Sequence, residues 1–119
     1  MGHLLIQKKT RVTKNPIKVY KVLEKTKDGY RTPVRRWLLR EDRIFKQQLN
    51  INEQGITDSG ILVFNSFLKA YLFKLTYPTL DLHIFNAIIP KFSNYAIDID
   101  GNIVANKVII KNVPYSRWK

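Results

Sequence analysis

The chain has 119 residues without a cysteine, 45% of them hydrophobic, and a formal net charge of +12. This length predicts one domain with a single core, and the lack of cysteine excludes a disulfide framework and a thiolate metal site. No apolar run is long enough to span a membrane, and the first residues lack the hydrophobic segment of a signal peptide. We therefore expect neither a membrane span nor secretion by a signal peptide.

Positive charge is concentrated in the first part of the chain. Residues 1–50 contain fourteen Lys and Arg against four Asp and Glu, a balance of +10, whereas residues 51–119 contain seven against five. Such asymmetry is typical of a surface that attracts an anionic partner, and equally of a basic surface that serves only solubility.

The first fifteen residues show neither a helical nor a strand period after Ile6. We predict that residues 1–15 form a basic N-terminal arm and that residues 16–119 form a single domain. The cations of this arm are Lys8, Lys9, Arg11 and Lys14.

The alternation from residue 17 onward predicts a strand. Ile17, Val19 and Leu23 share one face, and Lys21 interrupts that face. The sequence Lys27-Asp28-Gly29-Tyr30 then predicts a hairpin turn, because Asp-Gly tolerates the positive φ angles of a tight turn.

The strand that returns from this turn is expected over residues 30–39. Pro33 cannot donate to a ladder, so this strand lies at an edge or is broken there. Arg35 and Arg36 stand directly before Trp37. This combination can pair with phosphates and stack on a base, or it can anchor the Trp in the core with arginines at its rim.

Residues 40–52 fit two kinds of element. Phe45, Leu49 and Ile51 alternate as in a strand. Residues 44–49 also fit a turn of helix. We favour the strand.

The stretch from residue 60 to residue 75 contains the clearest change of period. Residues 61–64 predict a short strand, Ser66 is a natural N-cap, and the spacing after it is helical. Two apolar stripes run along this helix, Leu68, Leu72 and Leu75 in one and Phe67, Ala70 and Tyr71 in the other. We expect a helix over residues 66–75 that packs on a sheet and leaves only a narrow face in water.

A long strand and a hairpin complete the predicted elements. Residues 80–89 predict the longest strand, and the switch of alternation at Ile84 and Phe85 predicts either a bulge or burial on both faces. Asp100-Gly101 predicts a tight turn between strands over residues 95–99 and 103–110.

No cofactor and no metal site are expected. The run Asp98-Ile99-Asp100-Gly101-Asn102 spaces carboxylates as a calcium loop does, but no Glu follows to complete the ligand set, so a hairpin turn is favoured. His3 and His83 are the only histidines, and a metal at either would need ligands from distant residues.

One succession of residues resembles small domains of bacteriophages and their bacterial hosts. The matching residues are Gly60-Ile61, Val63-Phe64, Ser66, Ala70, Ile89-Pro90, Ile103-Val104-Ala105 and Lys107-Val108, after an N-terminal Lys18-Val19-Tyr20-Lys21-Val22. The resemblance implies a phage protein in the host cytoplasm or the virion. Leu62 stands where that family often has His, so no role of that His is carried over.

The order of strand, helix and hairpin is also distantly similar to the half-barrel of the ADP-ribosyltransferases. Those enzymes need a carboxylate on a late strand, usually Glu, to orient the nicotinamide ribose. Here the last Glu is Glu53, and only Asp81, Asp98 and Asp100 follow the predicted helix. This resemblance implies a shape and argues against the activity; a divergent transferase would have to use Asp81 or His83.

Together these patterns predict an α+β domain, a mainly antiparallel twisted sheet of five to seven strands with one buried helix on one face. The predicted function is a non-enzymatic interaction or assembly protein, monomeric or oligomeric, in a virion or nucleoprotein. Its basic half would dock onto an anionic partner, with direct nucleic-acid binding and a divergent transferase as alternatives. The predicted partner-binding residues are Lys8, Lys9, Arg11, Lys14, Arg31, Arg35, Arg36, Trp37, Arg40, Arg43, Arg117 and Trp118.

Overall fold

The computed structural model describes residues 3–4, 10–57 and 59–115, with side chains over 10–57 and 59–111. Its elements are β1 (His3–Leu4), β2 (Arg11–Val12), β3 (Ile17–Thr26), β4 (Gly29–Arg31), β5 (Ile44–Lys46), β6 (Ile56–Thr57), β7 (Ile61–Val63), α1 (Phe67–Thr76), β8 (Leu82–Ile89), β9 (Asn94–Ile97), β10 (Ile103–Ala105) and β11 (Lys107–Tyr115). Within these residues no helix has the length and apolar character needed to cross a membrane.

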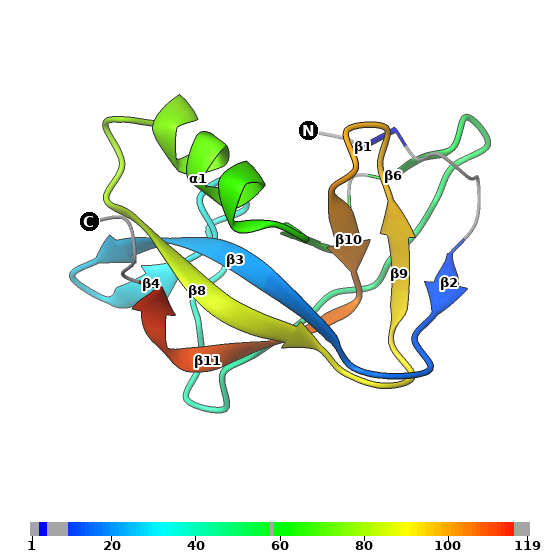
Figure 1. The fold of residues 1–119 in the computed structure, drawn as a ribbon, viewed down its shortest axis with the longest axis horizontal. Helices are drawn as coiled ribbons and strands as arrows, with labels where there is room; N and C mark the ends of the chain where they lie inside the picture. Colours follow the sequence, from blue (N-terminus) through cyan, green and yellow to red (C-terminus); the bar gives the residue numbers. More distant parts are fainter. Residues whose placement is uncertain (1–2, 5–9, 58, 116–119) are drawn as a thin grey trace.

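The strands form two main sheets, both antiparallel (Figure 1). One has five strands in the order β4-β3-β8-β11-β5, the other has four in the order β2-β9-β10-β7, and β1 pairs separately with β6. The prediction of an α+β domain with mainly antiparallel pairing is therefore confirmed. The prediction of one twisted sheet with five to seven strands was wrong.

The division into two sheets arises because the chain passes from one to the other at short interruptions. Residues 103–110 were predicted as one strand, but they divide at Asn106 into β10 and β11, which belong to different sheets. The Asn106 carboxamide Oδ1 accepts from the N–H of Asn94 at 2.9 Å, which stabilises the bend. A second link joins the sheets where Tyr20 and Phe64 exchange both backbone hydrogen bonds, each at 2.8 Å.

The main core lies between these sheets, and we call it the inter-sheet cluster. Its buried members are Val19, Leu23, Phe45, Ile61, Val63, Phe85, Ala87, Ile89, Ile103, Ala105, Val108 and Ile110. They come from β3, β5, β8 and β11 on one side and from β7 and β10 on the other. Both sheets therefore contribute an apolar face, as in other two-layer β structures.

Strand β8 is buried on both faces, which explains its switch of alternation. Ile84 packs on the helix side, whereas Phe85 points into the inter-sheet cluster. β8 pairs with β3 in one unbroken register from Leu82 to Ile89. Its ladder with β11 shifts register between the pairs Ala87–Ile110 and Phe85–Pro114, so an irregularity also lies near the predicted place, on the β11 side. The longest strand is β3, with ten residues, rather than β8, with eight.

Helix α1 covers the outer face of the five-stranded sheet (Figure 1). Ser66 is its N-cap, as predicted, and its hydroxyl accepts from the N–H of Lys69 at 3.2 Å. Beneath the helix lies a second core, the helix cluster, whose buried members are Val22, Phe64, Ala70, Leu82 and Ile84.

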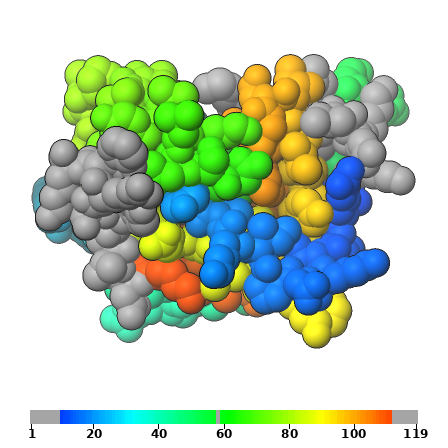
Figure 2. Space-filling view, viewed as in Figure 1, coloured from blue at the N-terminus to red at the C-terminus, as the bar shows by residue number. Residues whose placement is uncertain are grey.

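Only one of the two predicted stripes of the helix is covered. Leu68, Leu72 and Leu75 are 64%, 54% and 54% exposed. A single helix on a sheet has one covered side, so the outer stripe meets no other layer. The expectation of a narrow wet face was wrong, and in Figure 2 α1 forms a broad green surface.

The predicted N-terminal arm contributes to the fold in its described part. β2 pairs with β9, and β1 pairs with β6. Thr13 is buried, its hydroxyl donating to the Pro90 carbonyl and accepting from the N–H of Ser93, each at 2.8 Å. Residues 11–13 are thus held by the body of the domain. In the ambiguous stretch 40–52, the strand β5 forms and no helix does.

Candidate functional site

A turn after β4 directs Arg35 outward and Trp37 inward. Pro33 breaks the strand expected over residues 30–39, and Thr32 holds the turn. The Thr32 carbonyl accepts from the N–H of Arg36, and its hydroxyl accepts from the N–H of Trp37, each at 2.9 Å. Arg35 is exposed, while Trp37 packs against the inter-sheet cluster. We call residues 32–40 the arginine loop.

Lys21 is the only buried Lys or Arg among the residues that the structure describes. It lies on β3 between Val19 and Leu23 and is 5% exposed. Its Nζ donates to the carbonyl of Leu62 at 2.8 Å. Burial lowers the pKa of Lys21 from 10.5 to about 7, because removal of an ammonium group from water disfavours its charged form.

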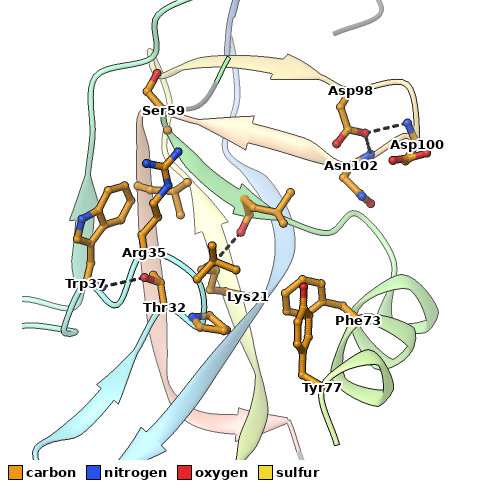
Figure 3. Close-up of a pocket in the computed structure, with 15 residues that line it drawn as sticks. Lys21, Thr32, Arg35, Trp37, Ser59, Phe73, Tyr77, Asp98, Asp100 and Asn102 are labelled. Carbon is orange, nitrogen blue, oxygen red and sulfur yellow. Dashed lines mark hydrogen bonds between the residues drawn. The ribbon is translucent and has the colours of Figure 1, made fainter. Parts of the chain in front are cut away.

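Lys21 and the arginine loop line one pocket with a volume of about 280 Å³ (Figure 3). Arg35 and Trp37 form part of its wall, and Phe73 and Tyr77 enter from α1 and the residue that caps its C-terminus. The pocket therefore combines aromatic surface with two basic groups, one buried and one exposed.

A third part of the wall is the turn between β9 and β10, where Asp98 is 3% exposed. One oxygen of Asp98, Oδ1, accepts from the N–H groups of Asp100 and Asn102, each at 2.9 Å. Figure 3 shows these three residues together, apart from Arg35 and Trp37. The predicted hairpin turn between β9 and β10 is confirmed.

The structure brings together only part of the predicted partner-binding set. Arg35, Arg36, Trp37 and Arg40 all lie on the arginine loop, and its three arginines are exposed. The sites of Lys8, Lys9, Arg117 and Trp118 lie outside the described residues.

The other predicted cations lie elsewhere or have partners. Arg31 bonds to Glu24 at 2.8 Å, and the Arg43 guanidinium donates to the carbonyl of Lys111 at 3.2 Å. Arg11 belongs to β2, and Lys14 follows it. Figure 1 shows β2 at the opposite end of the molecule from β4. The predicted cations that the structure describes thus lie on at least two separate parts of the molecule.

The residues named for a divergent transferase do not line the pocket. His83 Nε2 and the Asp81 carboxylate are 2.9 Å apart at the start of β8, and the ring of Tyr30 contacts His83 edge-on. Within the described part of the chain no three His, Asp or Glu residues are grouped so as to hold a metal ion.

Sequence reasoning did not identify Lys21 as a site residue. The signal was present, since a Lys at a position between Val19 and Leu23 on an otherwise apolar face indicates a buried amine. What it could not show was the cavity, because Leu62, Phe73 and Trp37 reach Lys21 from distant parts of the chain.

The chain was compared with protein families, with curated proteins and with solved structures. No family model matches it, and neither a curated protein nor a solved structure is significantly similar to it. The resemblances to phage domains and to the ADP-ribosyltransferase half-barrel therefore stay predictions.

Proposed function

We propose that the protein is a non-enzymatic binding domain that docks an acidic protein partner through the arginine loop. The observation that carries this proposal is the exposure of Arg35, Arg36 and Arg40 on one short loop. None of the three forms an ion pair or a side-chain hydrogen bond with another described residue. Their charges are therefore available to a partner.

The same loop exposes apolar side chains between its arginines. Val34 and Leu38 are each 49% exposed. Protein interfaces characteristically combine apolar contact with Arg, whose long stem packs while its guanidinium pairs with carboxylates. This mixture fits a protein segment that carries acidic and apolar side chains.

Several features of this region favour a protein over a nucleic acid. Trp37 is partly buried and packs against the inter-sheet cluster, so its ring is not a free stacking platform. Val34 and Leu38, which stand among the arginines, are each 49% exposed and offer apolar contact that a phosphate backbone cannot use.

The test compares one charge reversal at the loop with the same reversal elsewhere. A fluorescein-labelled peptide of alternating Glu and Leu is titrated with the wild-type protein and with Arg36→Glu/Arg40→Glu. We expect the loop variant to bind at least about tenfold more weakly, because two interface cations are replaced by like charges. The matched control, Arg11→Glu/Lys14→Glu, changes the net charge by the same amount, at one residue of β2 and one that follows it. It should lose less than about threefold in affinity for the peptide.

Two results would contradict the proposal. Equal losses in both double variants would show attraction to net charge without a docking site. Tighter binding of single- or double-stranded DNA than of the peptide, with a steep dependence on salt, would favour the nucleic-acid alternative.

A further inference from the structure

Outside the arginine loop itself, the most unusual group in the domain is the buried amine of Lys21. We propose that the pocket beside Lys21 binds a small monocarboxylate that carries one aromatic ring, with its carboxylate held by Lys21 and Arg35. This site adjoins the docking surface and shares Val34 and Arg35 with it, whereas Arg36 and Arg40 do not line the pocket.

The first support is the set of hydrogen-bond donors on Lys21. A protonated Lys has three N–H donors, and the Leu62 carbonyl takes one of them. No carboxylate among the described residues pairs with this ammonium group. A buried ammonium without a counter-ion is costly, so a bound carboxylate would supply both missing acceptors and the opposite charge.

Arg35 adds a second cation at the same pocket. Lys21 lines the cavity from β3 and Arg35 lines it from the arginine loop; in Figure 3 the Arg35 guanidinium extends toward Ser59, away from Lys21. A guanidinium presents parallel donors that match the two oxygens of a carboxylate. Because Arg35 is exposed, a change of its side-chain rotamer toward Lys21 would let both cations hold one carboxylate.

The other residues that line the pocket determine which apolar group can accompany the carboxylate. Trp37, Phe73 and Tyr77 contribute aromatic surface, and Pro33 and Val34 contribute aliphatic surface. The volume of about 280 Å³ lies at the small end of the range for ligand pockets. A single ring with a short acidic substituent matches this size and chemistry.

The opposite wall disfavours a more highly charged ligand. Asp98 and Asp100 line the pocket, and Asp98 is buried. A phosphate with a charge near two would meet these carboxylates, while a single carboxylate is balanced by Lys21 and Arg35. We therefore expect benzoate to bind more tightly than inorganic phosphate.

Binding should also change the protonation of Lys21. The charged or titratable side chains that line this pocket are Arg35 from the loop, Tyr77 from the end of α1, and Asp98 and Asp100 from the β9–β10 turn. Since burial holds the pKa of Lys21 at about 7, a large fraction of the amine is neutral at pH 8. A bound carboxylate favours the ammonium form, so binding at pH 8 should take up a proton.

Isothermal titration calorimetry with benzoate at pH 8, in two buffers of different protonation enthalpy, tests the site. The wild-type protein should bind benzoate with a Kd below about 1 mM and take up a fraction of a proton. Lys21→Met should weaken binding at least tenfold and abolish the uptake, while Lys18→Met, an exposed Lys on the same strand, should stay within twofold. Arg36→Glu/Arg40→Glu, at two residues that do not line the pocket, should weaken benzoate binding less than Lys21→Met does and leave the proton uptake in place, which distinguishes this site from the docking surface.

Three results would overturn the proposal. They are no saturable binding of benzoate to the wild-type protein, equal binding by Lys21→Met, and phosphate binding as tight as that of benzoate. If Lys21→Met does not fold, the carbon-13 resonance of Lys21 Cε can be followed in the wild-type protein. Saturating benzoate should then raise the pKa of Lys21, and an unchanged titration would equally overturn the proposal.

Discussion

The inter-sheet cluster and the helix cluster both lie against β3 and β8, but they are covered by different partners. The inter-sheet cluster is covered by a second sheet, which meets it along several strands with aliphatic side chains. The helix cluster is covered by one helix of ten residues, and much of its margin consists of partly buried aromatic rings such as Phe73 and Tyr77. Closure by the second sheet therefore buries more side chains than closure by the single helix, and the margins of both clusters stay partly exposed.

The pocket lies at the border between these clusters. Ile61 in its wall belongs to the inter-sheet cluster, whereas Phe73 and Tyr77 pack against the helix cluster. Lys21 occupies a position on β3 that would otherwise belong to the inter-sheet cluster. The open border is what gives its amine access to a ligand.

The largest expected effect is the loss of a ring from the inter-sheet cluster. Phe85 is 1% exposed, and its ring contacts that of Tyr30 edge-on at 4.8 Å. We expect Phe85→Ala to lower the free energy of unfolding by about 3–5 kcal/mol, because a large cavity remains. Urea denaturation followed by circular dichroism measures this. The control Phe92→Ala removes a ring that is 74% exposed and should cost far less; equal costs would contradict the burial of Phe85 in the inter-sheet cluster.

The next effect concerns Lys21 and depends on pH. Its pKa is about 7 in the folded chain and 10.5 in an exposed lysine, so between these values the unfolded chain binds a proton that the folded chain does not. The free energy of unfolding should therefore rise as the pH rises from about 7 to about 10.5, and this gain is lost as the pH falls through 7. The slope from this group is at most ~1.4 kcal/mol per pH unit.

Lys21→Met should remove this contribution to the pH dependence. The difference in unfolding free energy between the wild type and the variant is measured by urea denaturation at several values of pH. Because Lys18 on the same strand is exposed, Lys18→Met should leave the slope unchanged. A parallel pH dependence in wild type and Lys21→Met would show that the amine is hydrated in the folded protein.

A smaller effect is expected at the start of the helix. Ser66→Ala removes the hydroxyl that accepts from the N–H of Lys69, and should cost about 1 kcal/mol. Ser66→Asp retains a capping oxygen, so its free energy of unfolding should stay within a few tenths of a kcal/mol of the wild-type value. Thermal denaturation of both variants checks this, and an equal loss in both would mean that the cap contributes little to the closure of the helix cluster.

The smallest effect is expected on the outer stripe of the helix. Leu72 is 54% exposed, so Leu72→Gln should change the free energy of unfolding by less than about 0.5 kcal/mol. The measurement is repeated at low and high protein concentration. A larger loss of unfolding free energy that appears only at high protein concentration would show that a second copy of the protein covers this stripe.

Local features of the fold could be predicted from the sequence. Ser66 and the change of period after it identified α1, and Asp28-Gly29 and Asp100-Gly101 identified two turns. These signals depend on a few neighbouring residues, whose backbone preferences and hydrogen bonds act within one turn.

The arrangement of the sheets could not be predicted in the same way. Alternation shows that both faces of β8 are apolar, but it does not say which layer covers each face. The passage between sheets at Asn106 depends on contacts with Asn94 and Gln47, and no local pattern marks it. The candidate site was missed for the same reason, because a pocket exists only after distant segments meet around Lys21.

The paired backbone bonds between Tyr20 and Phe64 have a consequence for how the molecule opens. Because they connect a strand of one sheet to the end of a strand in the other, separation of the two layers requires these bonds to break. The domain should melt cooperatively, with the amide protons of both residues exchanging into deuterated solvent only at the rate of global unfolding. Ligand entry next to Lys21 must then rely on movements of side chains and of the arginine loop, within a backbone framework that stays closed.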